Sequence, residues 1–345
     1  MNAGGTADRP AGRSRAGETD TRGEGLRSFV SERLNLAGLA AVIVVIAVTF
    51  QVLNPIFLSF GNIVEMLRAG ALYFVVACAA TLVLVSGGID FSAGALYAAG
   101  GVVAGLLMTA GAPWPLAVIV GILIGAVLGL VNGAVTVYLK VPPLIATLGM
   151  FFAAGGIVIL ATKGNPVYGF PASFTRLGQG SVLGIPYLVY YAAISGILFW
   201  VLMAKTPLGY NARAVGGSRG SASANGIRIA RHDLIVYAVS GGMAALGGIL
   251  LAARLSSANP AAGGADLTFQ VVTAVIVGGT SLFGGIGGIG GSALGVLLFA
   301  EVNNGLVVIN VDPLAQNIFV GVILVTAVAI DQARRSRQFT RRKAR

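Results

Sequence analysis

The chain has 345 residues, of which 56% are hydrophobic and only 10% are charged. Soluble domains carry about 25% charged residues, so this composition excludes an ordinary soluble protein, and the single cysteine excludes a disulfide-rich scaffold. The formal net charge of +11 is concentrated in residues 1–35, 205–233 and 331–345. Because these patches surround a neutral apolar body, we expect a lipid bilayer as a partner and no nucleic acid.

Residues 1–35 are rich in glycine, arginine and acidic residues, which predicts a flexible cytoplasmic tail. The apolar runs that follow approach the length of about 20 residues needed to cross a bilayer. They predict an all-α polytopic membrane protein with about ten transmembrane helices. We expect the spans at 36–54, 68–86, 92–110, 115–138, 144–162, 186–204, 234–253, 269–283, 288–308 and 314–330. Whether 87–96 and 284–291 are re-entrant stays open.

Basic segments fix the expected orientation, because loops rich in lysine and arginine stay on the cytoplasmic side. The N-terminus, the loop 205–233 and the basic tail 331–345 all become cytoplasmic if ten spans are present. We therefore expect a transmembrane domain over 36–330, interrupted by a cytoplasmic loop at 205–233. This arrangement predicts a multi-pass membrane protein. The excess of arginine over lysine, 19 to four, is typical of a GC-rich bacterial genome, so we expect the protein in a bacterial cell membrane.

Glycine recurs every four residues in one predicted span, at Gly121, Gly125, Gly129 and Gly133. This spacing places all four on one face of a helix, where a neighbouring helix can approach closely. The pattern predicts a glycine-packed helix bundle.

Several motifs argue against enzyme chemistry. No phosphate-binding loop is present, so we expect no ATP or other cofactor on this chain. Residues 285–290 match a dinucleotide-binding pattern, but they lie between two spans and predict a glycine-rich bend. The only histidine, His232, lacks neighbouring metal ligands, so we expect a solvated loop residue and no metal site.

Polar residues inside apolar spans are costly and therefore are candidates for a translocation pathway. Asp90 follows a break in the apolar run, and helix capping by Asp90 and Ser92 is an equally good explanation. Two buried acids without a basic partner do not make the relay of a proton-driven carrier. The candidate pathway residues are Asp90, Ser92, Asn132, Glu301, Asn303 and Asn304.

The loop 205–233 contains a predicted docking element. Ser218 is a suitable N-cap for a short helix at 221–225, and Gly226 suits the left-handed position after it. The alternative is a solvated basic loop that only sets the topology. The candidate docking residues are Gly216, Gly217, Ser218, Arg219, Ala222 and Gly226.

Four segments together resemble the membrane permease subunits of ribose-type ABC importers, a family related to branched-chain amino acid ABC permeases. Ser86–Leu96 (SGGIDFSAGAL) is similar to the GGIDLSVG motif of that family. Asn132–Gly149, Gly209–Ile227 and Val277–Gly291 resemble its VPPFIATLG, cytoplasmic-loop and GGTSLxGGxG segments. The resemblance extends from about residue 54 to residue 330, most of the chain.

The resemblance implies a sugar importer and, with it, partners. A permease of this kind works as a homodimer, or as a heterodimer with a paralogous permease. It receives a sugar from an extracytoplasmic binding protein and is driven by a separate cytoplasmic ABC ATPase that docks on the loop helix. The resemblance also implies inverted related halves, spans two to five and seven to ten. The sequence does not identify the sugar.

Two departures from the family pattern bear on these roles. The loop has Gly220 and Ser223 where the family has glutamate and arginine, and Thr268-Phe269-Gln270 replaces its Glu-Leu-Asp. A glycine inside a short helix weakens it, so the altered loop leaves open how firmly an ATPase is held. The alternative functions are a branched-chain amino acid ABC permease and an ion-coupled secondary carrier.

Overall fold

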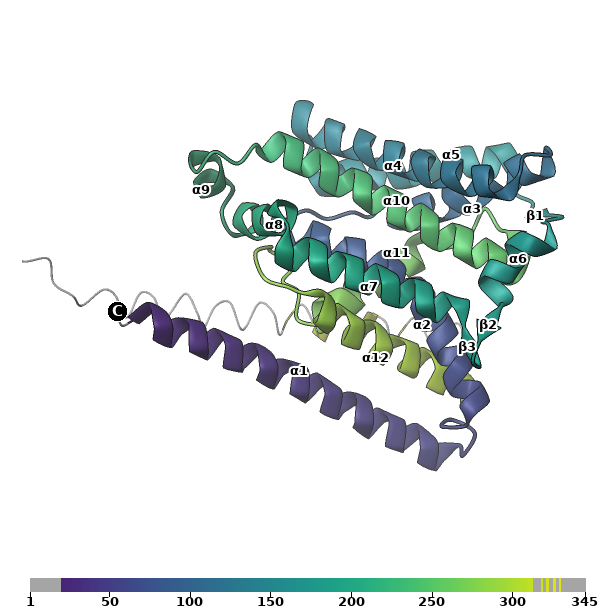
Figure 1. Ribbon diagram of the computed structural model, residues 1–345, viewed down its shortest axis with the longest axis horizontal. Helices are drawn as coiled ribbons and strands as arrows, with labels where there is room; N and C mark the ends of the chain where they lie inside the picture. The colour runs from purple at the N-terminus through teal and green to yellow at the C-terminus, as the bar shows by residue number, and fades with distance from the viewer. Residues whose placement is uncertain (1–19, 313–317, 319–320, 323–324, 327–328, 330–345) are drawn as a thin grey trace, which may run out of the picture.

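The computed structural model describes residues 20–312 and, beyond them, residues 318, 321–322, 325–326 and 329. Its long helices lie side by side as a bundle (Figure 1). The helices are α1 (Asp20–Leu53), α2 (Phe60–Val85), α3 (Ala93–Thr109), α4 (Trp114–Tyr138), α5 (Pro143–Thr162), α6 (Ala172–Gln179), α7 (Tyr187–Lys205), α8 (Pro207–Gly217), α9 (Arg219–Ala224), α10 (Ile229–Leu255), α11 (Gly264–Val277) and α12 (Ile289–Val308).

Helices of membrane-spanning length confirm the all-α polytopic class. Within the described residues, seven helices are long and apolar enough to cross a bilayer, and α3 and α11 are shorter apolar helices. These helices cover the first nine expected spans. The tenth expected span, 314–330, and the tail 331–345 lie outside the continuously described residues, so the count of ten stays a prediction.

Several helix boundaries differ from expectation. Helices α2 and α10 begin earlier than expected, at Phe60 rather than 68 and at Ile229 rather than 234. Helix α1 begins at Asp20, inside the segment 1–35 that we expected to be a tail, because residues 26–34 (LRSFVSERL) consist mostly of residues compatible with a helix. Helix α11 ends at Val277, before the expected end at 283, because Gly278 and Gly279 follow it and Gly279 adopts a φ of +94°.

Helix α10 lies at the centre of the bundle and packs on α2, α3 and α4. Helix α2 packs in turn on α7, α11 and α12, while α1 lies along the outside against α12 (Figure 1). None of the span within α1 is buried in the protein, and α4, α5 and α7 also expose many large apolar side chains. An apolar exterior of this extent is expected where the surroundings are lipid.

The contact between α4 and α10 confirms the predicted glycine packing. The buried residues of α4 are Ala117, Gly121, Gly125, Gly129, Asn132 and Gly133. A Cβ atom at Gly129 would lie 2.1 Å from the carbonyl oxygen of Tyr237, and one at Gly125 would lie 2.5 Å from that of Gly241. The two backbones therefore approach as closely as only glycine allows.

The two ends of the bundle have different loops. At one end, called here the α9 end, lie α8 and α9 (Figure 1). At the other, the strand end, lie α6 and two antiparallel ladders of two residues per strand (Figure 1). The ladders pair β1 (Val167–Tyr168) with β4 (Ser257–Ala258) and β2 (Ser181–Val182) with β3 (Ile185–Pro186).

Candidate functional site

A buried polar cluster occupies the irregular segment between α2 and α3. One carboxylate oxygen of Asp90 accepts a hydrogen bond from the amide of Ser92 at 2.9 Å, and the other accepts one from the hydroxyl of Ser240 at 2.7 Å. Asn132 donates from its side-chain amide to the hydroxyl of Ser92 at 2.8 Å. These four residues, the Asp90 cluster, join the irregular segment to α4 and α10.

The capping explanation for this segment is only partly right. Asp90 does bond the amide of Ser92, but Ser92 makes no side-chain capping bond to the first turn of α3. The amide of Gly94 in that turn instead donates to the hydroxyl of Thr268 on α11, at 2.9 Å. A free backbone amide at the start of α3 thus finds its acceptor on α11, a helix distant in sequence. The side chain of Ser92 is therefore available to bond Asp90 and Asn132.

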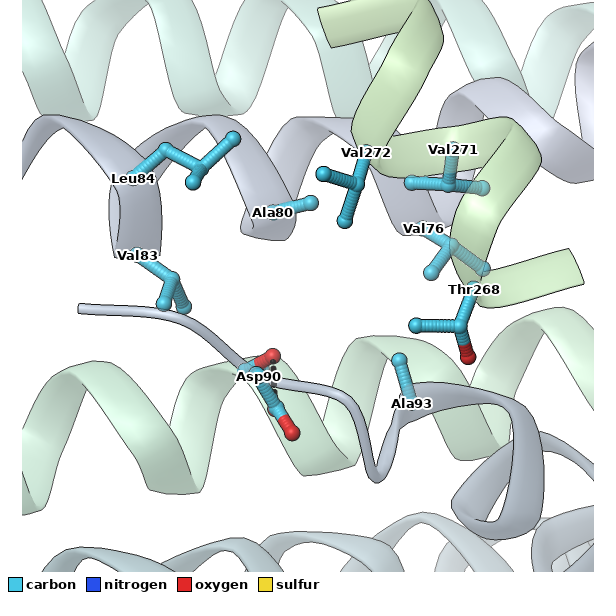
Figure 2. Close-up of a pocket in the computed structure, with 10 residues that line it drawn as sticks. Val76, Ala80, Val83, Leu84, Asp90, Ala93, Thr268, Val271 and Val272 are labelled. Carbon is cyan, nitrogen blue, oxygen red and sulfur yellow. Dashed lines mark hydrogen bonds between the residues drawn. The ribbon is translucent and has the colours of Figure 1, made fainter. Parts of the chain in front are cut away.

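A cavity opens beside the Asp90 cluster (Figure 2). Its apolar walls come mainly from α2 and α11, and Asp90, Ser240 and Thr268 supply polar groups. The full lining is Val76, Ala80, Val83, Leu84, Asp90, Ala93, Ser240, Thr268, Val271 and Val272. The cavity volume of about 10 Å³ leaves room for about one water molecule, so the cavity is far smaller than an open small-molecule site.

The predicted docking loop forms a helical hairpin at the α9 end. Ser218 caps α9, since its hydroxyl accepts a hydrogen bond from the amide of Ser221 at 3.3 Å. Gly226 adopts a φ of +83°, as expected after a helix end. The helix spans Arg219–Ala224 rather than 221–225, because helical residues begin directly after the Ser218 cap. Ala222 is its buried residue.

Glycines hold this hairpin against the ends of the long helices. A Cβ atom at Gly216 would lie 1.9 Å from the carbonyl oxygen of Val85, the last residue of α2. That same oxygen accepts a hydrogen bond from the amide of Gly285 at 2.8 Å. Gly87, with a φ of +75°, and Gly284 complete the contact, which is called here the glycine junction (Gly87, Gly216, Gly284, Gly285).

An ion pair forms a second link between the hairpin and the bundle. Arg219 of α9 bonds the carboxylate of Asp233 on α10, and the Asp233 side chain is 8% exposed. The preceding residue, His232, is buried, contrary to the expected solvated ring, and its Nε2 lies 3.0 Å from the hydroxyl of Ser86. The reason is that α10 begins at Ile229, so His232 lies in a helix that packs on α2 rather than in a loop.

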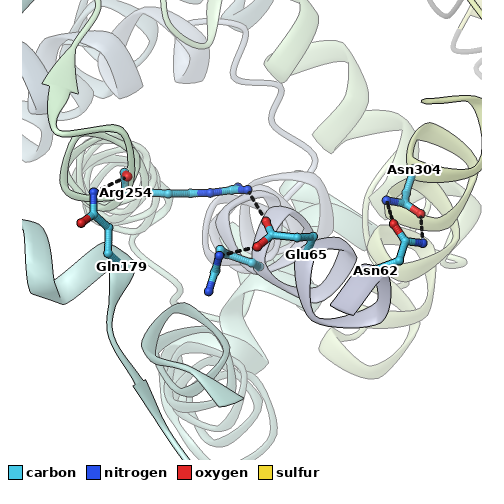
Figure 3. A network of polar contacts seen from close by, with 6 residues as sticks. Asn62, Glu65, Gln179, Arg254 and Asn304 are labelled. Carbon is cyan, nitrogen blue, oxygen red and sulfur yellow. Dashed lines mark hydrogen bonds and ion pairs between the residues drawn. The ribbon is translucent and has the colours of Figure 1, made fainter. Parts of the chain in front are cut away.

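The remaining predicted pathway residues form a separate group on α12, toward the strand end. Glu301 is buried, and Asn303 lies 3.4 Å from the side-chain oxygen of Gln270. Asn304 and Asn62 of α2 exchange two hydrogen bonds of 2.7 and 3.0 Å (Figure 3). No hydrogen bond among the described residues connects this group to the Asp90 cluster.

A charged network near the strand end was not predicted. Arg254, in the last turn of α10, bonds Glu65 of α2 at 3.1 Å, and Glu65 also pairs with Arg68 (Figure 3). Gln179 of α6 donates to the carbonyl oxygen of Arg254 at 3.0 Å. The sequence did offer a signal for the pair of Glu65 with Arg68, because residues three apart in a helix lie side by side. Nothing local in the sequence indicates Arg254.

Within the described residues, no group of three or more histidine, cysteine and acidic side chains lies together as metal ligands would.

Ser240, Tyr237 and Thr268 also belong to the site and were not predicted from the sequence. The signal for the first two was their spacing from Asp233, because residues at i, i+4 and i+7 share one helix face.

Comparisons with known proteins place the chain among transport permeases. The family model described as branched-chain amino acid transport system, permease component, matches residues 62–328. The chain is 36% identical to the ribose import permease protein RbsC of Bacillus subtilis, over 84% of this chain and 90% of that protein.

Further relatives carry related names. The D-allose transport system permease protein AlsC of Escherichia coli is 35% identical, over 86% of this chain and 91% of that protein. The galactose/methyl galactoside import permease protein MglC of Salmonella typhimurium is 34% identical, over 88% and 96% respectively. No solved structure matches the chain.

Proposed function

The chain belongs to the family of transport permease components described as branched-chain amino acid transport system permeases, and from this membership we propose that it is the membrane subunit of an ABC importer for a sugar. The observation that carries the proposal is the identity of 34–36%, over more than four fifths of the chain, to permeases named for ribose, D-allose and galactose. The protein is accordingly a multi-pass membrane protein and a transport subunit rather than an enzyme.

The substrate class is argued from the relatives as well. The printed description of the family names branched-chain amino acid transport. The relatives that match more than four fifths of this chain, however, are named for sugars. Sugars present many hydroxyl groups, and the cavity beside Asp90 offers a carboxylate and two hydroxyls within apolar walls. The cavity has a volume of about 10 Å³, which is too small for a sugar, so we propose that it widens during transport and that these groups then contact the solute.

The proposed partners follow from the absence of a phosphate-binding loop in the sequence together with the import function. A separate ABC ATPase binds and hydrolyses ATP at the cytoplasmic face, and an extracytoplasmic binding protein delivers the sugar. The exposed residues Gly217, Ser218 and Gly226 of the α8–α9 hairpin are available to contact the ATPase. Of the other docking candidates, Gly216 packs on the end of α2, Ala222 is buried and Arg219 pairs with Asp233, so these three support the hairpin rather than meet the ATPase. The α9 end is then cytoplasmic, and two permease chains form the translocating dimer.

Helix packing supports inverted related halves. Helix α2, the first of its half, packs on α11 and α12, while α10, the first of the other half, packs on α3 and α4. Each half thus places its first helix on the second and third helices of the other. The cavity lies where α2, α3, α10 and α11 meet, which is where halves related in this way are expected to hold a solute.

Vesicle transport tests the proposal. The complex that co-purifies with an affinity-tagged copy of this chain is reconstituted into liposomes with enclosed ATP. We expect uptake of radiolabelled ribose, allose or galactose that requires ATP and the co-purified ATPase. Uptake of a branched-chain amino acid instead would support the alternative substrate class. Uptake by this chain alone, driven by an ion gradient, would exclude an ABC importer.

A further inference from the structure

Helix α8 packs on α7, and two further contacts near α9 attach the α8–α9 hairpin to α2 and α10. At the glycine junction, backbones touch without side chains between them. The second contact is the ion pair between Arg219 and Asp233. Helix α9 has only six residues, and its N-cap is also the residue that ends α8. A helix this short is held by its tertiary contacts, and the ion pair is the charged contact that joins α9 itself to α10.

The ion pair is asymmetric in exposure. The Asp233 side chain is 8% exposed, whereas that of Arg219 is 48% exposed. A buried carboxylate that loses its cation is strongly disfavoured, while the exposed arginine loses less. Separating Arg219 from Asp233 is therefore costly, so when α9 moves, α10 is expected to move with it.

Asp233 begins a line of polar contacts along one face of α10. Four residues later, the hydroxyl of Tyr237 donates to the carbonyl oxygen of Ile89 at 3.3 Å. Seven residues after Asp233, the hydroxyl of Ser240 donates to Asp90 at 2.7 Å. The three positions share one helix face and span about 10 Å along its axis. This face connects α9 to the residues before α3 and to the cavity that Asp90 lines in Figure 2.

We propose that the Arg219–Asp233 ion pair is the contact through which movement of α9 is transmitted, along the Tyr237–Ser240 face of α10, to the Asp90 cluster. Arg219 and Asp233 act as positioning residues that touch no solute. The proposal rests on the proposed function, because it assigns to one ion pair the coupling between a partner ATPase at α9 and the cavity.

Charge-reversal variants test this contact in the co-purified importer complex, reconstituted in liposomes with radiolabelled ribose, allose and galactose as probes. The readout is the number of sugar molecules imported per ATP hydrolysed. We expect Arg219→Asp and Asp233→Arg to lower this ratio about fivefold or more while ATP hydrolysis continues. The double variant restores the pair with reversed polarity, so we expect it to recover most of the ratio.

Two further variants separate transmission from folding and docking. Arg219→Lys keeps the charge and is expected to stay near the wild-type ratio. Arg231→Gln removes an exposed arginine in the first turn of α10, which makes no ion pair within the described residues, and is expected to leave the ratio unchanged. ATPase co-purification, measured for every variant, reports docking directly.

The outcomes distinguish this proposal from the proposed function. ATP-dependent uptake by the wild-type complex with unchanged ratios in both single variants would overturn the transmission role alone. Single variants that lose the ATPase from the complex, with no recovery in the double variant, would also overturn it and assign Arg219 to docking. Absence of ATP-dependent uptake by the wild-type complex would overturn the proposed function, and the transmission role with it.

Discussion

At the scale of single residues, burying the Asp90 carboxylate costs free energy that hydrogen bonds must offset. It lies within the apolar body without an ion pair among the described residues, and hydrogen bonds from Ser92 and Ser240 stabilise it. Hydrogen bonds to a charged group contribute about 1.5–3 kcal/mol each. The Asp90 side chain thus helps to hold the segment between α2 and α3, together with the hydrogen bond from Tyr237 to Ile89 and the glycine junction.

Replacing Asp90 with leucine tests that role. The Asp90→Leu variant keeps a similar volume but leaves the hydroxyl of Ser240 and the amide of Ser92 without their acceptor. We expect the free energy of unfolding to fall by about 2 kcal/mol or more, measured as a lower apparent Tm in detergent. Ser240→Ala removes only one donor and should lower Tm less. An Asp90→Leu protein as stable as the wild type would contradict this assignment.

The sequence indicated Asp90, Ser92 and Asn132, because polar residues stand out in apolar runs, and the structure brings these three together. It did not indicate Ser240 as the partner of Asp90, or Asp233 as the partner of Arg219. Those contacts join residues that are far apart along the chain or on different helices, and no local pattern records such pairing. His232 was misplaced for the same reason, since its partner Ser86 belongs to another helix.

At the scale of elements, the glycine-lined contact of α4 with α10 fixes the centre of the bundle. We expect Gly129→Leu to prevent correct packing, because its Cβ atom alone would lie 2.1 Å from the carbonyl oxygen of Tyr237. The matched control is Gly149→Leu on α5, where a Cβ atom meets nothing within 4 Å. Size-exclusion chromatography of the detergent-solubilised protein should show a monodisperse peak for the control only. A monodisperse Gly129→Leu variant would refute the close approach.

Two glycines of the α9 region provide a test, because alanine at each is expected to change ATPase affinity in opposite directions. Gly220 lies inside the helix with open space around it, so Gly220→Ala favours the helix by about 0.5–1 kcal/mol. If α9 docks an ATPase, the dissociation constant should fall about two- to fivefold. Gly226→Ala forces alanine to a φ of +83° and should raise it. Equal binding by both variants would argue against a docking role for α9.

The elements themselves were largely predictable, since long apolar runs identify helices without reference to their neighbours. The glycine spacing also identified which face of α4 is buried. Helix ends were less predictable: α1 extends back to Asp20 and α11 stops at Val277. Hydropathy locates the apolar part of a helix but not where its backbone hydrogen bonds begin or end.

At the scale of the whole molecule, the two proposed halves share short sequence features that are easily overlooked. Gly87-Gly88-Ile89-Asp90 before α3 has a counterpart in Gly263-Gly264-Ala265-Asp266 at the start of α11. Val131-Asn132-Gly133 in α4 has one in Val302-Asn303-Asn304-Gly305 in α12. The reciprocal packing of α2 and α10 connects these features in space. Such short matches are too weak to establish a repeat until the helix contacts are known.

The orientation of the chain is a further prediction at this scale. A single cysteine is introduced at Arg228, near α9, or at the exposed Asn165, which follows α5 near the strand end, after replacement of the buried Cys78 by alanine. Because basic loops stay cytoplasmic, a membrane-impermeant maleimide should label position 228 only in inside-out vesicles and position 165 only in intact spheroplasts. Labelling of both positions from the same side would contradict the proposed topology.

The central claim is that this chain moves a sugar only when a separate ATPase acts on it. The most direct measurement is uptake of radiolabelled ribose, allose and galactose by liposomes holding the co-purified complex, compared with liposomes holding this chain alone, with and without enclosed ATP. The account predicts uptake of at least one sugar by the complex with ATP, and none by the chain alone under an ion gradient. Gradient-driven uptake by the chain alone, or the absence of ATP-dependent sugar uptake by the complex, would contradict it.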